Sequence, residues 1–243
     1  MTYAGGRRLR TVHGVTEEED EEEVGRERVR RVMGLGPGQR VVGVTTGGAP
    51  IATLADLASL RRDFEMAHQF ISTFAGLARS EVESDSPQQA LWIAAVTMYG
   101  RAFGTTGLRH SARASAEIYN ADDRAAHDYL IAMRNKYIAH SVNAFEQAAV
   151  FAIISGDSAD ELHLEGVGTQ HSSLARLSRA RALQIATMCE RQLEDIDCRL
   201  TEAQAEVATE LTKRGPEFIL SLDELGMMTV DESAVNRGRS RHE

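Results

Sequence analysis

Apolar residues recur every three or four positions over about forty residues, from 172 to 213. This spacing places them on one face of a single long α-helix. A helix of that length would extend about 60 Å, which is more than a compact bundle needs. We therefore expect one end of it to project or to pair with a second copy of the chain. The apolar positions of this stripe are Leu174, Leu177, Ile185, Met188, Ile196, Leu200, Ala203, Val207 and Leu211.

Further helices are predicted upstream of this stripe. One covers about 50–82, where apolar residues again follow the helical period. A second covers 86–103 and opens with a serine, a proline and two glutamines, which is typical of a helix start. A third covers 120–139, with an asparagine cap and an acidic first turn. A short helix is also expected over 111–119.

One segment has the pattern of strands instead of helices. Residues 147–154 are apolar and rich in β-branched side chains, a Gly-Asp-Ser turn follows, and residues 161–165 alternate between polar and apolar. This pattern predicts a β-hairpin at about 147–168. The predicted fold class is therefore all-α, an up-and-down helical bundle over 50–214 with a small β-hairpin insertion and a long C-terminal helix.

The two ends of the chain differ from this central region in composition. Seven consecutive acidic residues occupy 17–23, several arginines follow, and residues 34–48 are rich in glycine. Such a segment cannot bury a core, so we predict a disordered arm over 1–49, with a short strand at 41–44 as the alternative. A flexible tail is expected over 215–243.

Composition excludes several classes of function. Lys and Arg number 27 against 36 Asp and Glu, and the net charge of −9 argues against binding of duplex nucleic acid by bulk positive charge.

Cys189 and Cys198 fall on opposite faces of the long helix, so no disulfide is expected. His163 and His171 lack a third ligand, so no metal site is expected. The N-terminus lacks a signal-peptide core and no apolar run is long enough to span a membrane, which predicts a cytoplasmic protein.

A motif at the end of the third helix suggests chemistry. Within Leu130 to Ser141, Arg134 is followed directly by Asn135, and five residues separate Arg134 from His140. Five other arginine–histidine pairs in the chain have a comparable spacing, so the spacing alone is not selective. The asparagine, the position at the end of an apolar-striped helix and the string RNKYIAHS distinguish this pair.

This motif resembles the signature of the HEPN superfamily, whose nucleases are helical bundles. The resemblance implies a metal-independent endoribonuclease that leaves a 2′,3′-cyclic phosphate, uses no cofactor and carries its catalytic residues at Arg134, Asn135 and His140. It also implies a toxin or antiviral-defence role, with an antitoxin or another protein as a possible partner. Toxin members of the superfamily often carry a tyrosine two residues after the histidine, whereas this chain has Val142.

The residue types suit cleavage of RNA. Histidine titrates near neutral pH and can transfer the protons of the reaction. Arginine offers a fixed, bidentate cation for phosphate oxygens, and Asn135 could orient the histidine or bind an oxygen of the substrate. On a straight helix, however, Arg134 and His140 would lie about 120° apart. A two-fold homodimer that brings two such helix ends together would complete the site, as the superfamily resemblance also implies.

Other residues are weaker candidates. Lys136, Arg101 and Arg109 could add contacts to RNA, although surface arginines that balance an acidic domain are the simpler interpretation of the last two. His127 falls on the same helix face as Arg134, but a lone histidine there is commonly packed or solvated. Two residues just past the motif, Asn143 and Glu146, could lie near the same cleft or form caps and turns. The alternative function is a non-catalytic HEPN-like module that binds RNA or a protein through its long helix.

Overall fold

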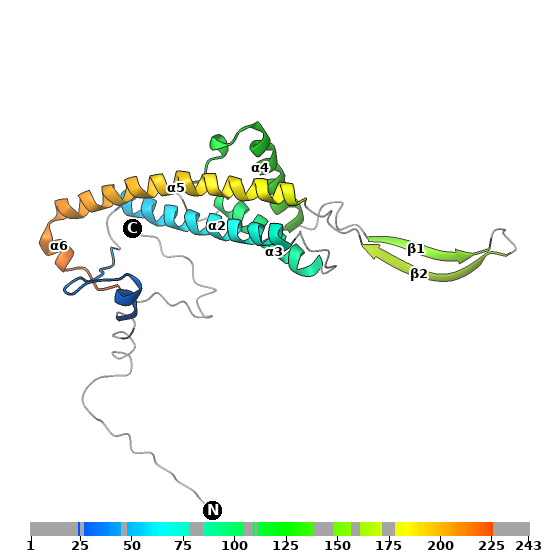
Figure 1. Ribbon diagram of the computed structural model, residues 1–243, viewed down its shortest axis with the longest axis horizontal. Coiled ribbons are helices and arrows are strands. Elements are labelled where there is room, and N and C mark those ends of the chain that lie inside the picture. Colours follow the sequence, from blue (N-terminus) through cyan, green and yellow to red (C-terminus); the bar gives the residue numbers. More distant parts are fainter. Residues whose placement is uncertain are drawn as a thin grey trace, which may run out of the picture. The chain divides into compact units, whose positions relative to one another are not determined.

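The computed structural model is mostly helical and contains one small antiparallel sheet (Figure 1). The chain forms two compact units, one of residues 52–207 and the other of the two ends, 1–51 and 208–243. The structure describes Val24, 27–44, 48–77, 85–104, Arg109, 111–138, 148–156, 161–171 and 178–225.

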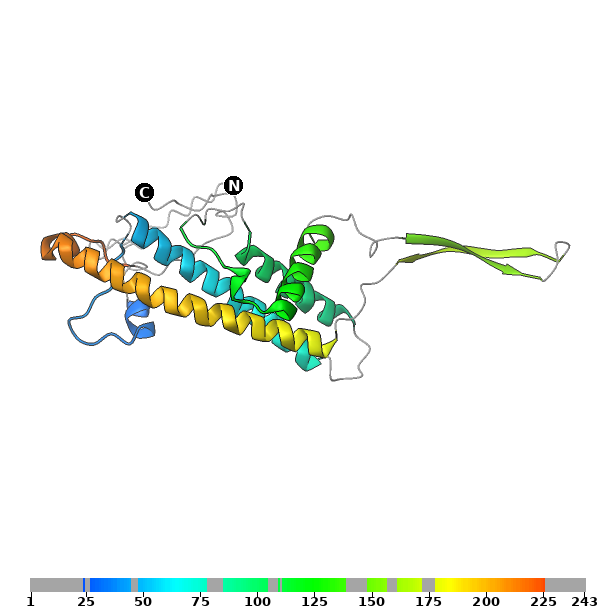
Figure 2. The same ribbon diagram turned by 90° about the horizontal axis from the view of Figure 1, so that it is seen from above.

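The predicted helices are present, with shifted ends. Helix α2 spans Ala49–Leu77, α3 spans Asp85–Ala102, α4 spans Ala121–Met133 and α5 spans Arg179–Arg214. In Figures 1 and 2, α2 and α5 run side by side. An ion pair between Arg61 and Asp197 (2.7 Å) and a contact between His68 Nε2 and Glu190 Oε1 (3.1 Å) join these two helices. The short helix predicted over 111–119 is limited to a single 3₁₀ turn, η1 (Ala116–Ile118).

The core of the larger unit is formed where the apolar stripes of these helices meet. Phe64 of α2 packs edge-on against Tyr99 of α3, with ring centroids 5.8 Å apart. Burial of such side chains is the main stabilising contribution to a bundle of this kind. The largest fully buried apolar side chains are Leu57, Leu60, Phe64, Ile71, Val96, Tyr99, Leu130, Ile185, Met188 and Ile196.

The predicted β-hairpin is also present. Strand β1 (Ala148–Ser155) pairs antiparallel with β2 (His163–His171), and the register shifts by one residue between Ile153 and Ile154. The second strand continues to His171, three residues beyond the predicted end at 168. The extension follows from the pairing, because Ala148, Ala149 and Val150 need partners at positions 171, 170 and 169.

The smaller unit joins described segments that lie near the two ends of the chain. Residues 27–32 are helical, and Val42 bridges to Glu224. Helix α6 (Pro216–Leu220) begins after Gly215, whose φ of 84° suits glycine. The described parts of the predicted arm (1–49) and tail (215–243) thus contain a helical segment, one bridge and α6, and the bridge at Val42 falls within the alternative strand at 41–44. Neither segment can form a core alone, but each supplies hydrogen-bond partners to the other. The acidic run at 17–23 lies outside the described residues.

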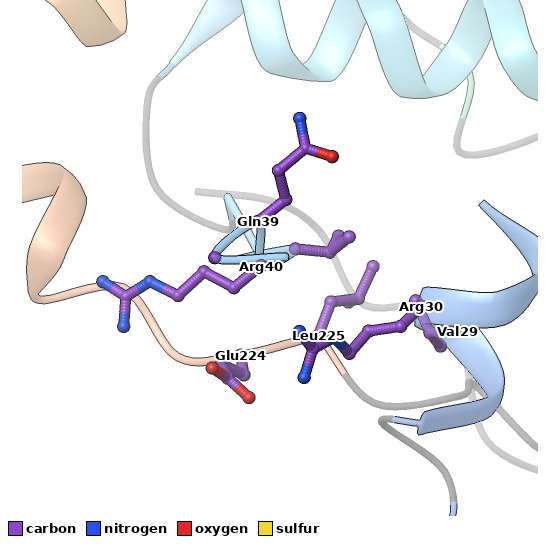
Figure 3. Close-up of a pocket in the computed structure, with 8 residues that line it drawn as sticks. Val29, Arg30, Gln39, Arg40, Glu224 and Leu225 are labelled. Atoms are coloured by element: carbon purple, nitrogen blue, oxygen red, sulfur yellow. The ribbon is translucent and has the colours of Figure 1, made fainter. Parts of the chain in front are cut away.

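A small hollow lies within this unit (Figure 3). Its volume is about 180 Å³. The hollow is bordered by both positive and negative side chains, Arg30, Arg40 and Glu224, and by the apolar Val29 and Leu225. This mixture of charges does not select one class of ligand.

Candidate functional site

Helix α4 carries the motif, and its beginning is firmly anchored. The side chain of Asn120 accepts a hydrogen bond from the backbone N–H of Asp123 (2.9 Å), which confirms the predicted cap. The carboxylate of Asp123 is itself buried, forms an ion pair with Arg191 of α5 and accepts a hydrogen bond from Gln184 (3.0 Å). These contacts hold the start of α4 against α5 and so fix the direction in which α4 runs toward the motif.

The helix changes form at the motif arginine. Residues Arg134–Ile138 make a π-helical turn, η2, directly after α4 ends at Met133. In a π-helix the backbone hydrogen bonds skip one more residue than in an α-helix, and such turns occur frequently at functional sites. The sequence predicted a regular helix to Ala139, so the position of this turn is a finding of the structure alone.

The side chain of Arg134 lies against the backbone of α3. A Cβ atom built on Gly100 would come within 2.7 Å of the Arg134 Cγ, so only glycine leaves room for the arginine at this position. Nη1 of Arg134 donates a hydrogen bond to Oδ1 of Asn135 (2.9 Å). Asn135 and Lys136 are exposed. Within the described part of the chain, Arg134 forms no ion pair, so its charge is not neutralised by a carboxylate there.

Two other predicted RNA contacts, Arg101 and Arg109, have a different environment. Both form ion pairs with Asp63 of α2, whose carboxylate is buried (Arg109 at 2.6 Å and Arg101 at 3.2 Å). Arg109 also donates to the hydroxyl of Ser59 (3.1 Å), and its side chain is only 14% exposed. Arg101 remains 53% exposed. Arg109 therefore anchors the chain after α3 to α2, while Arg101 stays accessible at the end of α3.

Arg101 and Arg134 both lie at the last turn of α3. Arg134 packs on Gly100, and Arg101 is the next residue along the helix. Arg101 and Arg109 carry two positive charges against the one carboxylate of Asp63, and Arg134 adds a third, so this end of α3 is locally cationic although the whole chain is acidic. Asp63 and Gly100 were not predicted from the sequence. No sequence pattern marks either of them, since each acts through residues distant along the chain.

His127 is a core residue instead of part of an open site. Its ring is buried, its Nδ1 lies 3.0 Å from the hydroxyl of Tyr99, and the Phe103 ring packs against it at 4.5 Å. Burial lowers the pKa of His127 and raises the pKa of Tyr99. The hydroxyl of Tyr99 also contacts that of Tyr119 (3.1 Å). This network satisfies polar atoms inside the bundle and gives His127 a structural role.

Several predicted candidates lie outside the described residues. These are His140, Asn143 and Glu146. Among the described residues, no group of three His, Cys, Asp or Glu side chains is placed to hold a metal ion. Cys189 is buried and Cys198 is exposed, which confirms their predicted positions on opposite helix faces. None of the described helices has the length and apolarity required to cross a membrane.

Comparison of the whole chain with known proteins finds no match to a family model, to a curated protein or to a solved structure. The fold and the site by themselves define a mainly helical protein whose α4 ends in a turn that carries Arg134 and Lys136.

Proposed function

We propose that this protein is a metal-independent endoribonuclease of the HEPN type, acting as a toxin or antiviral-defence effector in the cytoplasm. The observation that carries the proposal is the environment of Arg134. This arginine begins the π-helical turn, rests on Gly100 and forms no ion pair in the described part of the chain. An arginine held in place without a carboxylate partner is available to bind an anion such as a phosphodiester.

Each motif residue has a defined task in the proposed reaction. His140 would take the proton from the ribose 2′-hydroxyl, whose oxygen attacks the adjacent phosphorus. The bond from phosphorus to the 5′-oxygen then breaks, and that oxygen receives a proton from a second histidine. Arg134 would stabilise the charge on the non-bridging oxygens, while the hydrogen bond from Arg134 holds Asn135 beside it. The products are a 2′,3′-cyclic phosphate and a free 5′-hydroxyl.

The reaction needs one histidine as base and another as acid, whereas the motif has one in each chain. We propose that a two-fold homodimer supplies both, together with two copies of Arg134. Lys136 and Arg101, which are exposed near each motif, would bind the phosphates that flank the cleaved bond. Arg109 would contribute less to RNA binding, because most of its side chain is buried against Asp63 and Ser59.

The test is cleavage of labelled single-stranded RNA in the presence of EDTA. The wild type would be compared with Arg134→Ala and His140→Ala, and with Arg62→Ala as a matched control. Arg62 is an arginine of α2 with a 69% exposed side chain and a weak ion pair to Glu65 (3.8 Å). We expect the wild type and Arg62→Ala to cleave RNA to cyclic-phosphate ends, and both motif variants to lose cleavage at least a hundredfold.

The outcomes separate the two candidate functions. Cleavage that persists in correctly folded Arg134→Ala and His140→Ala variants would remove the site assignment. RNA binding without cleavage, lost in Arg134→Ala but kept in Arg62→Ala, would instead support a non-catalytic HEPN-like binding module. A folded wild type that neither binds nor cleaves RNA would support a protein-binding module, which is the form of the second candidate that the excess of acidic residues over the whole chain favours.

A further inference from the structure

The buried carboxylate of Asp63 binds its two arginines unequally. Nη2 of Arg109 lies 2.6 Å from Oδ2 of Asp63, whereas Nη2 of Arg101 lies 3.2 Å from Oδ1. Arg109 has two further contacts, because its Nε donates to the hydroxyl of Ser59 (3.1 Å) and its Nη1 donates to the backbone carbonyl of Arg101 (3.4 Å). Arg109 is therefore the cation that compensates the buried carboxylate, since it is both the closer and the more buried of the two arginines.

Arg101 supplies a charge in excess of the one that Asp63 requires, and its direction is fixed. One edge of its guanidinium faces Asp63, and Nη1 lies 3.8 Å from the sulfur of Met98, which is a weak acceptor. The side chain nevertheless remains half exposed. An arginine that is already oriented loses less conformational entropy when it binds a ligand. Arg101 therefore combines an accessible charge with a preferred orientation.

Arg134 presents a second guanidinium at the same turn of α3. The aliphatic part of its side chain rests on the backbone of Gly100, the residue directly before Arg101. Consecutive Cα atoms are about 3.8 Å apart, and an arginine side chain is longer than this distance. Both guanidinium groups can therefore reach the oxygens of one phosphate, to which each can donate in bidentate fashion.

We propose that Arg101 and Arg134 together bind a phosphodiester of the RNA strand, and that Asp63 is a positioning residue that aims Arg101 at it. The inference rests on the proposed function, which supplies the RNA ligand. A carboxylate beside a phosphate would ordinarily weaken binding by repulsion. Here Arg109 compensates that charge, so the remaining effect of Asp63 is its contact with Arg101.

Replacement of Asp63 by asparagine separates the effect of charge from that of position. Asp63→Asn keeps the shape of the side chain but has one oxygen, and its NH₂ group cannot accept a hydrogen bond. The closer and more buried Arg109 would keep the oxygen, so the NH₂ group would face Arg101 and displace it. Loss of a negative charge alone would tighten RNA binding, whereas loss of the orientation of Arg101 would weaken it.

The test is fluorescence anisotropy of a labelled single-stranded RNA whose 2′-oxygens are all methylated, so that no 2′-hydroxyl can attack the phosphate. We expect Asp63→Asn and Arg101→Gln each to weaken binding about tenfold. Arg101→Gln should also lower the slope of log Kd against log salt concentration by about 0.7, the value for one phosphate contact on a single strand. The matched controls Asp197→Asn and Arg62→Gln make the same charge changes in exposed ion pairs, and they should alter binding less than about twofold.

A double variant tests whether the two arginines bind the same group. Arg134→Gln combined with Arg101→Gln should weaken binding by less than the product of the two single effects, because loss of either arginine already disturbs the phosphate that the other one holds. Effects that multiply fully would show two independent contacts and would overturn the pair.

Tighter or unchanged binding by folded Asp63→Asn would overturn the positioning role of Asp63. An unchanged salt slope in Arg101→Gln, or a wild type that does not bind the methylated strand, would overturn the site. Circular dichroism checks the fold of each variant. If Asp63→Asn does not fold, Arg101→Lys replaces it, since lysine keeps the charge but lacks the planar group that Asp63 orients. Wild-type affinity in Arg101→Lys would then contradict the role of orientation.

Cleavage of unmethylated RNA, measured in parallel, tests the proposed function separately. Cleavage by the wild type together with unchanged binding in Asp63→Asn and Arg101→Gln would leave the nuclease standing without this phosphate site. Binding that depends on both residues, in a wild type that does not cleave, would leave the phosphate site standing without the nuclease.

Discussion

Two groups of arginine side chains lie beside the last turn of α3, and they differ in what surrounds them. Arg101 and Arg109 share the buried carboxylate of Asp63 on α2. Arg134 rests on Gly100 instead, donates to Asn135 and forms no ion pair in the described part of the chain. The first group, which we call the Asp63 cluster, holds the bundle together. The second, at the π-helical turn, leaves a positive charge available.

This contrast indicates which arginines can serve binding. A carboxylate that is almost fully buried is tolerated only when cations and hydrogen-bond donors compensate it, so Arg109 and Arg101 stabilise the fold by pairing with Asp63, while Arg101, which is 53% exposed, also presents charge to the solvent. Among the described residues, Arg134 has no buried carboxylate to compensate. The same residue type therefore has different roles at this end of α3, and the position of Asp63 decides which arginines are paired with a carboxylate.

The largest expected effect comes from removing the carboxylate of the Asp63 cluster. Asp63→Ala would leave two partly buried arginines without their partner, and we expect the free energy of unfolding to fall by about 3–5 kcal/mol. Urea denaturation followed by circular dichroism measures this. The control is Asp197→Ala, which breaks an exposed ion pair with Arg61 and should cost less than about 1 kcal/mol. Equal losses in both variants would remove the special role of Asp63.

The next effect tests the Arg134 side of the comparison. Gly100→Ala would push a methyl group into the Arg134 side chain and displace its guanidinium. We expect RNA cleavage to fall by about a hundredfold, because a misplacement of about 1 Å can cost this much. Gly76→Ala is the control, since nothing lies within 4 Å of a Cβ at Gly76 of α2. Unchanged cleavage in folded Gly100→Ala would show that the position of Arg134 is unimportant.

A smaller effect is expected at the far end of α4. Asn120→Ala removes the cap hydrogen bond to Asp123 and should lower the free energy of unfolding by about 1 kcal/mol. Because the Arg134 turn lies at the other end of the helix, cleavage by the folded protein should be unchanged. Thermal melting together with the RNA assay checks both statements, and Asn120→Asp should restore the stability. A loss of cleavage beyond the loss of folded protein would contradict the separation of the two helix ends.

The last prediction concerns pH and the buried side of the comparison. Burial lowers the pKa of His127 in the folded state, so the unfolded chain binds its proton more readily. The stability linked to His127 is fully present above the unfolded pKa of about 6.5 and is lost as the pH falls through the lower folded pKa. Wild-type unfolding free energies should therefore decrease more between pH 7.5 and pH 5 than those of His127→Gln. Parallel pH curves would contradict this assignment.

Much of the secondary structure could be predicted because it depends on local patterns. The cap at Asn120 confirms its prediction, as does the burial of Ile185, Met188 and Ile196 along the long stripe of α5. The candidate site was predicted only as far as its motif. Arg134 and Asn135 could be proposed from their spacing and their resemblance to a known signature, but not their neighbours.

Contacts between residues far apart in sequence could not be predicted from local patterns. A short strand at 41–44 was the alternative to an unstructured arm, but nothing in the sequence indicated that Val42 would bridge to Glu224. Arg109 could not be separated from Arg101 by sequence. Arg109 is mostly buried and Arg101 is half exposed, because the exposure of each side chain depends on how α2 packs against the end of α3.

The sequence by itself determined where helices and strands form, because helix caps, apolar periodicity and turn residues act over a few neighbouring positions. It also determined the order of these elements along the chain. Only the tertiary structure decided that Asp63 pairs with Arg101 and Arg109, that Gly100 makes room for Arg134 and that Val42 bridges to Glu224. The physical reason is that charge compensation and steric fit depend on distances between residues far apart in sequence, and packing alone sets those distances.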